Sequence, residues 1–202
     1  IKCLKSISLV EKDIEPLLAH KDELIGLGLE GTINKSSHEI LPKLGNLKAL
    51  YLDSTTLKSF TYISELPIEK LSLYGRQPSD TLELEKLTGL KEIHIKNNSN
   101  WIDFSFLSKL DNLERIKLSY CAKIESVPSL DELTRLKCIE LSNCNRLIDI
   151  QALWKLGKGC SVLATGKQLS KERLAYQFDK DTGISDWCKE YSVNIPDDIL
   201  NR

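Results

Sequence analysis

Two short segments of the sequence have the residue types and spacing of ligand-binding loops. The first, residues 26–31, reads G-x-G-x-x-G, which in dinucleotide-binding proteins follows a strand and opens a helix. Here leucines alternate with the glycines, so we expect a buried strand that binds no nucleotide. The second, residues 179–190, has acidic residues at the first, third and twelfth positions of a calcium loop. Its sixth position is Ile184 where such a loop needs glycine, so we interpret the segment as an acidic turn.

Residues that could carry out catalysis are sparse. The three histidines, His20, His38 and His94, belong to no zinc-protease motif, and neither a nucleophile elbow nor a phosphate-binding loop occurs. Charged residues make up 28% of the chain, so neighbouring carboxylates occur throughout and identify no site. We therefore expect that the protein is not an enzyme and that it binds no metal or cofactor.

The cysteines favour a reducing environment. None of the six forms a C-x-x-C pair, which argues against a zinc knuckle. We expect reduced thiols in a cytoplasmic protein. The alternative is a secreted protein with disulfides, in which the sequons at residues 34–36 and 97–99 would matter. The cysteines are Cys3, Cys121, Cys138, Cys144, Cys160 and Cys188.

The overall charge and hydropathy exclude several classes of partner. The formal net charge of −1 gives no general attraction to nucleic acid or to an anionic membrane. No stretch approaches the roughly 18 apolar residues of a membrane-spanning helix. The sequence contains no methionine, so we expect that Ile1 is not the natural translation start.

A repeated apolar pattern organises the chain. The spacing L-x-x-I-x-L-x-x-C-x-x-I-x-x-V begins at Leu113, and the same classes of residue recur 23 residues later from Leu136. The alternating core of each unit predicts a short strand with one buried face. The Cys position predicts an inward turn, and apolar residues at every third position then suit a short 3₁₀ segment. This unit resembles the leucine-rich repeat L-x-x-L-x-L-x-x-N/C, in its short, internalin-like class.

The resemblance implies an α/β solenoid with a curved parallel β-sheet on its concave face and short 3₁₀ or irregular segments on its convex face. We expect a single domain, residues 1–202, with repeats over residues 4–166 and a helical C-terminal cap over residues 167–202. A short helix over residues 13–21 would cover the other end. The first three apolar positions of the expected units are Leu4, Ile7, Leu9; Leu24, Leu27, Leu29; Leu47, Leu50, Leu52; Ile68, Leu71, Leu73; Leu90, Ile93, Ile95; Leu113, Ile116, Leu118; Leu136, Ile139, Leu141; and Cys160, Leu163, Thr165.

The inward turn position varies among the repeats. Arg76 departs from the pattern, so we expect the segment 75–79 to loop out. The residues at this position are Thr32, Thr55, Arg76, Asn98, Cys121 and Cys144.

Side chains alternate along a strand, so the residues between and beside the paired leucines face outward on the concave side. At the two ends of this surface they are small. In the middle, tyrosine, histidine and arginine lie among mixed charges, the composition of binding hot spots. An ordinary solvated sheet also favours Tyr and Lys, and the C-terminal tail is an alternative contact region. The predicted partner-binding residues are Tyr51, Asp53, Lys70, Tyr74, Glu92, His94, Lys96, Arg115, Lys117, Tyr120 and Glu140.

These observations predict a non-enzymatic solenoid that binds another protein. The specific hypothesis is a cytoplasmic inhibitor, such as an immunity protein, that neutralises an enzyme or toxin by occlusion and is monomeric when free. It rests on analogy to inhibitors with this kind of repeat. The alternative is the ligand-recognition domain of a larger intracellular receptor or adaptor. A module tuned by calcium or binding nucleic acid is a third class, and the near-neutral charge argues against nucleic acid.

Overall fold

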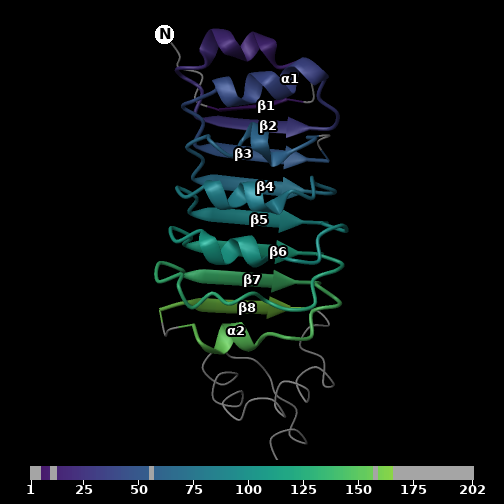
Figure 1. Ribbon diagram of the computed structural model, residues 1–202, viewed down its shortest axis with the longest axis vertical. Coiled ribbons are helices and arrows are strands. Elements are labelled where there is room, and N and C mark those ends of the chain that lie inside the picture. The colour runs from purple at the N-terminus through teal and green to yellow at the C-terminus, as the bar shows by residue number, and fades with distance from the viewer. Residues whose placement is uncertain (1–5, 10–12, 55–56, 157–158, 166–202) are drawn as a thin grey trace, which may run out of the picture.

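Eight short strands form one parallel sheet in which each strand pairs with the next along the chain (Figure 1). The computed structural model describes residues 6–9, 13–54, 57–156 and 159–165. The predicted C-terminal cap and the calcium-like segment at residues 179–190 lie outside these residues. The strands are β1 (Ser6–Leu9), β2 (Gly26–Glu30), β3 (Ala49–Asp53), β4 (Lys70–Tyr74), β5 (Glu92–Lys96), β6 (Arg115–Ser119), β7 (Cys138–Ser142) and β8 (Ser161–Thr165).

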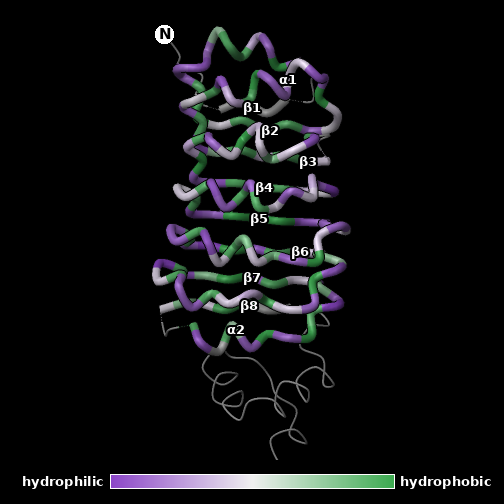
Figure 2. Tube along the Cα trace, in the orientation of Figure 1, coloured by the Kyte–Doolittle hydropathy of each residue, from purple (hydrophilic) through white to green (hydrophobic). Residues whose placement is uncertain are grey.

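Alternation along each strand creates the core. In β3, Leu50 and Leu52 are buried while Tyr51 between them is half-buried, and β5 repeats the pattern. Strand pairing aligns Leu50 with Leu71 of β4, so the leucines of neighbouring repeats stack. Figure 2 shows the resulting apolar segments at every level of the stack. The expected inward residues of β2 to β7 are therefore confirmed, and the glycine-rich segment 26–31 coincides with β2 rather than with a helix entrance.

Short helices cover the opposite face of the sheet, in front of the strands in Figure 1. They are mostly 3₁₀ helices because leucines at every third residue, such as Leu84 and Leu87, keep one side of the chain in the core. The helix expected near residues 13–21 is present as a 3₁₀ helix. These elements are η1 (Glu15–His20), α1 (Lys35–Ile40), η2 (Leu41–Lys43), η3 (Phe60–Tyr62), η4 (Thr81–Lys86), η5 (Ser105–Lys109) and α2 (Gln151–Trp154). We call the helix-covered side convex and the open side of the sheet concave.

The residue after each of the strands β2 to β7 adopts a left-handed backbone conformation. This conformation lets its N–H donate to the carbonyl that ends the next strand, as from Gly75 to Lys96 and from Tyr120 to Ser142, both at 2.8 Å. Glycine and asparagine tolerate a positive φ best. Tyr120, with a φ of 55°, is an unusual occupant of this position. The residues in this conformation are Gly31, Ser54, Gly75, Asn97, Tyr120 and Asn143.

The inward turn position is confirmed in the later repeats and wrong in two earlier ones. Asn98, Cys121 and Cys144 are fully buried, and the Asn98 side chain accepts a hydrogen bond from the Trp101 N–H at 2.8 Å. Thr32 and Arg76 are exposed instead. The next residue along the chain is buried in each case: Ile33 in place of Thr32, and Gln77 in place of Arg76. In both repeats the turn is one residue longer after the left-handed position. Thr55 lies outside the described residues.

The Gln77 side chain replaces the expected loop-out with an ordered turn. Gln77 is buried, and its Nε2 donates to the Tyr74 carbonyl at 2.7 Å. The Gln77 carbonyl in turn accepts from the Asn100 side chain at 2.8 Å. These contacts connect the fourth repeat to the fifth.

The predicted register of the eighth strand is wrong by one residue. Pairing of Ile139 with Val162 keeps the 23-residue period of the preceding repeats, whereas the prediction used 24. Val162 is therefore buried, and Leu163 lies on the concave side with 55% of its surface exposed. A slip of one residue exchanges the two faces of a strand, so a single misjudged spacing was enough to invert this prediction.

Candidate functional site

The predicted partner-binding residues lie together on the concave side of β3 to β7, with Tyr120 directly after β6. Strand pairing aligns Ser72 with Tyr51 on one side and with His94 on the other. It then aligns His94 with Lys117 and, through Lys117, with Glu140. All of these side chains are half-buried or exposed. The surface is one strip because the period of the sheet brings residues about 22 positions apart to neighbouring strands, roughly 4.8 Å away.

Three aromatic rings form a row across β3, β4 and β5. Tyr51 and Tyr74 pack edge to face with 4.9 Å between ring centroids, and Tyr74 and His94 do the same at 4.8 Å. The Lys96 ammonium lies 5.2 Å from the centroid of Tyr74, within range of a cation–π interaction. We call Tyr51, Tyr74 and His94 the aromatic row.

Hydrogen bonds fix the orientation of these rings. The Tyr51 hydroxyl donates to the Asp53 carboxylate at 2.9 Å. The Tyr74 hydroxyl and His94 Nδ1 are also 2.9 Å apart. Each ring is therefore held by a polar contact at its tip as well as by edge-to-face packing, which leaves the row few alternative rotamers.

The same packing shifts the ionisation of the row. Burial, reinforced by the hydrogen bond to Asp53 and its charge, raises the pKa of Tyr51 to about 12. Burial lowers the pKa of His94, and the nearby ammonium groups of Lys117 and Lys96 lower it further. His94 is therefore a neutral imidazole at pH 7, and the row presents hydroxyl and imidazole groups rather than charges.

Two ion pairs flank the row on the concave side. Lys70 binds Glu92 at 2.9 Å between β4 and β5, and Lys117 binds Glu140 at 2.7 Å between β6 and β7. Arg115 lies between these pairs on β6, is exposed, and has no ion-pair partner among the described residues. These five side chains, with Ser72 and His94, line a hollow of about 280 Å³.

The predicted partner-binding residues omit two members of this surface. Leu163 extends the concave surface beyond Glu140, and a strict 23-residue spacing would have placed it there. Ser72 forms part of the hollow, but a serine between two buried leucines carries no distinctive signal. Tyr120 was among the predicted residues, and 51% of its surface is exposed in the structure. Its left-handed backbone conformation was not predicted.

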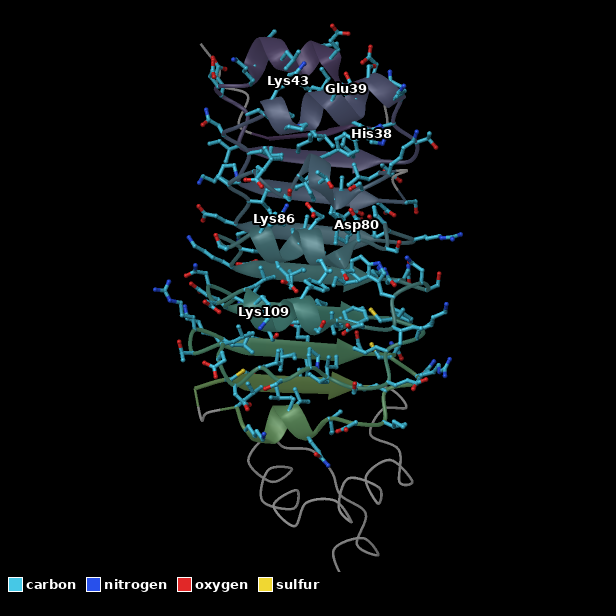
Figure 3. All side chains as sticks on the ribbon, viewed as in Figure 1. His38, Glu39, Lys43, Asp80, Lys86 and Lys109 are labelled. Carbon is cyan, nitrogen blue, oxygen red and sulfur yellow. The ribbon has the colours of Figure 1, made fainter. Side chains whose placement is uncertain are left out.

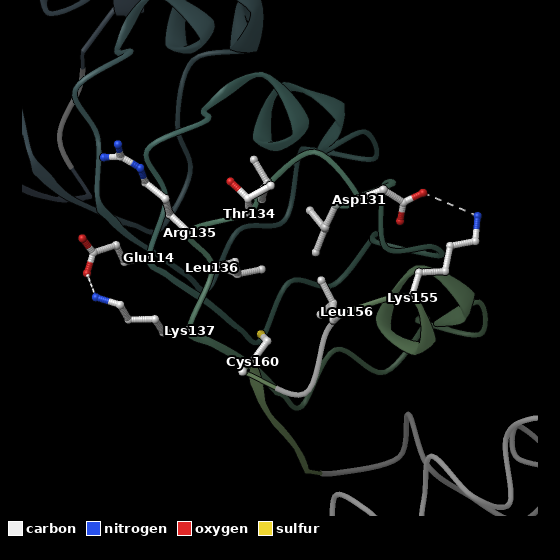
Figure 4. Close-up of a pocket in the computed structure, with 12 residues that line it drawn as sticks. Glu114, Asp131, Thr134, Arg135, Leu136, Lys137, Lys155, Leu156 and Cys160 are labelled. Carbon is white, nitrogen blue, oxygen red and sulfur yellow. Dashed lines mark hydrogen bonds and ion pairs between the residues drawn. The ribbon is translucent and has the colours of Figure 1, made fainter.

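Other parts of the described chain offer less chemistry. A cavity of about 610 Å³ lies beside the start of β7 and β8, next to Leu136, Leu156 and Cys160 (Figure 4). Charged side chains at its rim bind one another, Lys137 to Glu114 and Lys155 to Asp131, as the dashed lines in Figure 4 show. Within the described ranges, no cluster of three His, Cys, Asp or Glu side chains could hold a metal ion. No helix in those ranges has the length and apolar character needed to cross a membrane.

Comparison with solved structures identifies the fold. Internalin C2 from Listeria monocytogenes superposes with a TM-score of 0.54 at 20% sequence identity, covering 81% of this chain and 77% of that protein. An internalin, InlF, from the same organism gives a TM-score of 0.47 at 19% identity, covering 83% of this chain and 65% of that protein. No family model matches the sequence, and no curated protein matches it.

The first of these likenesses, together with the parallel sheet and the 3₁₀ turns, shows that this chain has the leucine-rich-repeat fold. A solenoid of this kind is typically a non-catalytic scaffold that binds proteins on its concave side. At this level of identity the comparison defines the architecture, and the residues of the concave side must carry any argument about the partner.

Proposed function

We propose that this protein is a non-enzymatic solenoid that binds a second protein on its concave side and inhibits it by occlusion. The partner would be an enzyme or a toxin in the cytoplasm, and the chain would act as an immunity-type inhibitor. The contact surface consists of the aromatic row, the two ion pairs that flank it, Arg115 and Tyr120.

The aromatic row is the observation that carries this proposal. Tyr51, Tyr74 and His94 are partly exposed, yet each is held by a ring contact and a hydrogen bond at a defined position. Side chains ordered before binding lose little conformational entropy when a partner arrives. Tyrosine and arginine are also the residue types most often found at energetic hot spots of interfaces.

The cysteines support a reducing location. Cys121, Cys138, Cys144 and Cys160 are all unbridged, and only Cys138 among them is partly exposed. Thiols that form no disulfide are usual in cytoplasmic proteins and less common in secreted ones.

Site-directed cross-linking in the source cell tests the proposal. A photo-reactive residue replaces Ser72 on the concave side in one variant and Lys109 in another. Lys109 lies on the convex side as the last residue of η5, and Figure 3 labels it there. We expect one partner to cross-link from position 72 only, and mass spectrometry identifies it.

The activity of the captured partner then separates the two candidate functions. Addition of one equivalent of the wild-type chain should abolish the partner's activity, and a Tyr74→Ala variant should fail to do so. A partner whose activity does not change on binding would contradict inhibition and favour the recognition domain of a receptor or adaptor. Cross-linking from position 109 alone would contradict the concave site itself.

A further inference from the structure

The hollow beside the aromatic row is lined by two ion pairs and one further cationic side chain. Lys70 and Glu92 form one wall, and Lys117 and Glu140 form the other, each pair joined by a short ion pair. Within each pair the charges compensate one another. Arg115 is aligned with Glu92 in the sheet but forms no ion pair with any described residue, so the three cations and two carboxylates of the hollow leave a net charge of +1.

The His94 ring lines this hollow and carries a buried polar atom without a hydrogen-bond partner among the described residues. Its Nδ1 contacts the Tyr74 hydroxyl, whereas its Nε2 is buried without a hydrogen-bond partner among the described residues. A neutral imidazole has one donor and one acceptor nitrogen. When the Tyr74 hydroxyl donates to Nδ1, Nε2 carries the hydrogen and becomes a buried donor that needs an acceptor. A buried donor without an acceptor is unfavourable, so a shift of the ring that brings Nε2 to an acceptor in the hollow is favoured.

The dimensions of the hollow limit what can enter it. A volume of about 280 Å³ is just below the range of roughly 300–1,000 Å³ that is usual for small-molecule pockets. One amino-acid side chain fits this space. Among side chains, a carboxylate matches both the planar fork of a guanidinium, which it binds with two parallel hydrogen bonds, and the imidazole donor.

We propose that this hollow receives a glutamate or aspartate side chain of the bound partner, with Arg115 as its principal ligand and Lys117 and His94 as neighbouring donors. This inference rests on the proposed function, since it specifies the chemistry of the partner at the centre of the same surface. It predicts an acidic residue that projects from the partner toward β5 and β6.

A peptide titration followed by NMR tests the carboxylate site without requiring the partner. The probes are acetyl-Gly-Glu-Gly-amide, its neutral isostere acetyl-Gly-Gln-Gly-amide and acetyl-Gly-Lys-Gly-amide, compared at constant ionic strength. We expect the Glu peptide alone to shift the signals of Ser72, His94 and Arg115 in a saturable manner. The pKa of His94 should rise on binding, because a carboxylate beside the ring favours the imidazolium.

Matched variants of two exposed arginines decide whether the site is specific. Arg115→Gln should weaken binding of the Glu peptide by about tenfold or more, as expected for loss of a charge-assisted hydrogen bond. Arg135→Gln should leave the affinity unchanged, because Arg135 lies in the connection before β7, where it contacts Asn112 in the connection before β6. Any one of four results would overturn the inference. Two concern the Glu peptide: equal binding of the Glu and Gln peptides, or no saturable binding of the Glu peptide. The other two are signal shifts spread over the whole surface and an unaltered affinity of the Arg115→Gln variant.

The result of the peptide titration can be distinguished from the result of the inhibition assay that tests the proposed function. If the peptide fails to bind while Tyr74→Ala still abolishes inhibition of the partner, the concave interface stands and only the carboxylate site is wrong. If the peptide binds as expected but Tyr74→Ala and Arg115→Gln leave inhibition intact, the hollow is an anion site that receives no side chain of the partner, and the concave location of the proposed function is wrong.

Discussion

The backbone of Tyr120 is strained for an L-residue with a side chain of this size. A left-handed conformation is unfavourable by roughly 1–2 kcal/mol except for glycine and, partly, asparagine. Equivalent positions in the neighbouring repeats are Asn97 and Asn143, yet here an exposed tyrosine occupies the turn. Strain of this kind persists mainly where a side chain serves a function. Tyr120 therefore fits a role in partner contact better than a role in folding.

Replacement of Tyr120 by asparagine tests this interpretation. The free energy of unfolding should rise by up to about 1 kcal/mol, because the left-handed conformation becomes less costly. Urea denaturation at constant m-value measures the change, and the reverse substitution Asn143→Tyr should lower stability by a similar amount. Once the partner is in hand, the same Tyr120→Asn variant should bind it more weakly. A loss of stability in Tyr120→Asn would show that the tyrosine is a structural residue.

His94 should make stability depend on pH. Its pKa is lowered in the folded state, mainly by burial and then by Lys117 and Lys96, while Glu140 acts in the opposite direction. The Tyr74 hydroxyl from β4 also contacts the ring. Below the ordinary pKa of about 6.5 the unfolded chain takes up a proton that the folded chain resists, so stability is full above this value and falls as pH falls through it. His94→Gln should flatten this decline between about pH 7 and pH 5 in denaturation experiments. An NMR-measured pKa of His94 above 6.5 would contradict the account.

Cys121 and Cys144 should be reduced and protected. Both are fully buried at the inward turn position, and each thiol lies near a strand carbonyl, at 3.8 Å for Cys121 and Ile95 and 3.7 Å for Cys144 and Leu118. The hydrogen bond with Cys144, together with burial, holds the pKa of the Cys121 thiol well above its usual range. Thiol reagents should therefore modify both only after unfolding. Fast labelling of the native protein, or loss of two hydrogens traced to this pair by mass spectrometry, would be the opposite result.

At the scale of elements, the alternation of apolar and polar residues predicted the strands reliably, whereas the spacing between repeats predicted the turns less well. The strands β2 to β7 follow from paired leucines, because burying one side of a strand leaves little choice of register. The turns after β2 and β4 were misplaced by one residue, because Ile33 and Gln77 enter the core after a longer turn. The helix α1 was not expected, although Asn34 is a good N-cap and its side chain accepts from the Ser37 N–H at 2.8 Å. Local turn length has little sequence signal until the neighbouring repeat is in place.

The corrected register of β8 makes a sharp prediction. Val162→Asp should destabilise the protein by several kcal/mol, since it buries a charge without a partner. Leu163→Asp should have an effect near zero on stability, because Leu163 is on the exposed concave side. Thermal unfolding of the two variants in parallel gives the comparison, with Leu141→Asp as a destabilised reference. If Leu163→Asp is the more damaging of the pair, the originally predicted register is correct.

At the scale of the whole molecule, the solenoid turns a one-dimensional pattern into a surface. Residues one repeat apart become neighbours, so the outward-facing residues of the candidate site could be predicted from sequence alone. The contacts within the site could not. Three features depend on side-chain rotamers: Tyr74 contacts His94, Lys70 and Lys117 pair with carboxylates, and Arg115 forms no ion pair within the described part of the chain. These contacts separate a general sheet surface from one with a defined centre.

Calorimetry with the captured partner is the most direct test of the concave interface. Tyr74→Ala and Arg115→Ala should each weaken binding by at least about 2 kcal/mol if they are hot spots, with folding nearly intact because both side chains are partly or fully exposed. The convex variant Lys109→Ala should bind as the wild type does. The account would be contradicted if both concave variants bind normally, while deletion of residues 167–202 abolishes binding without unfolding the repeats.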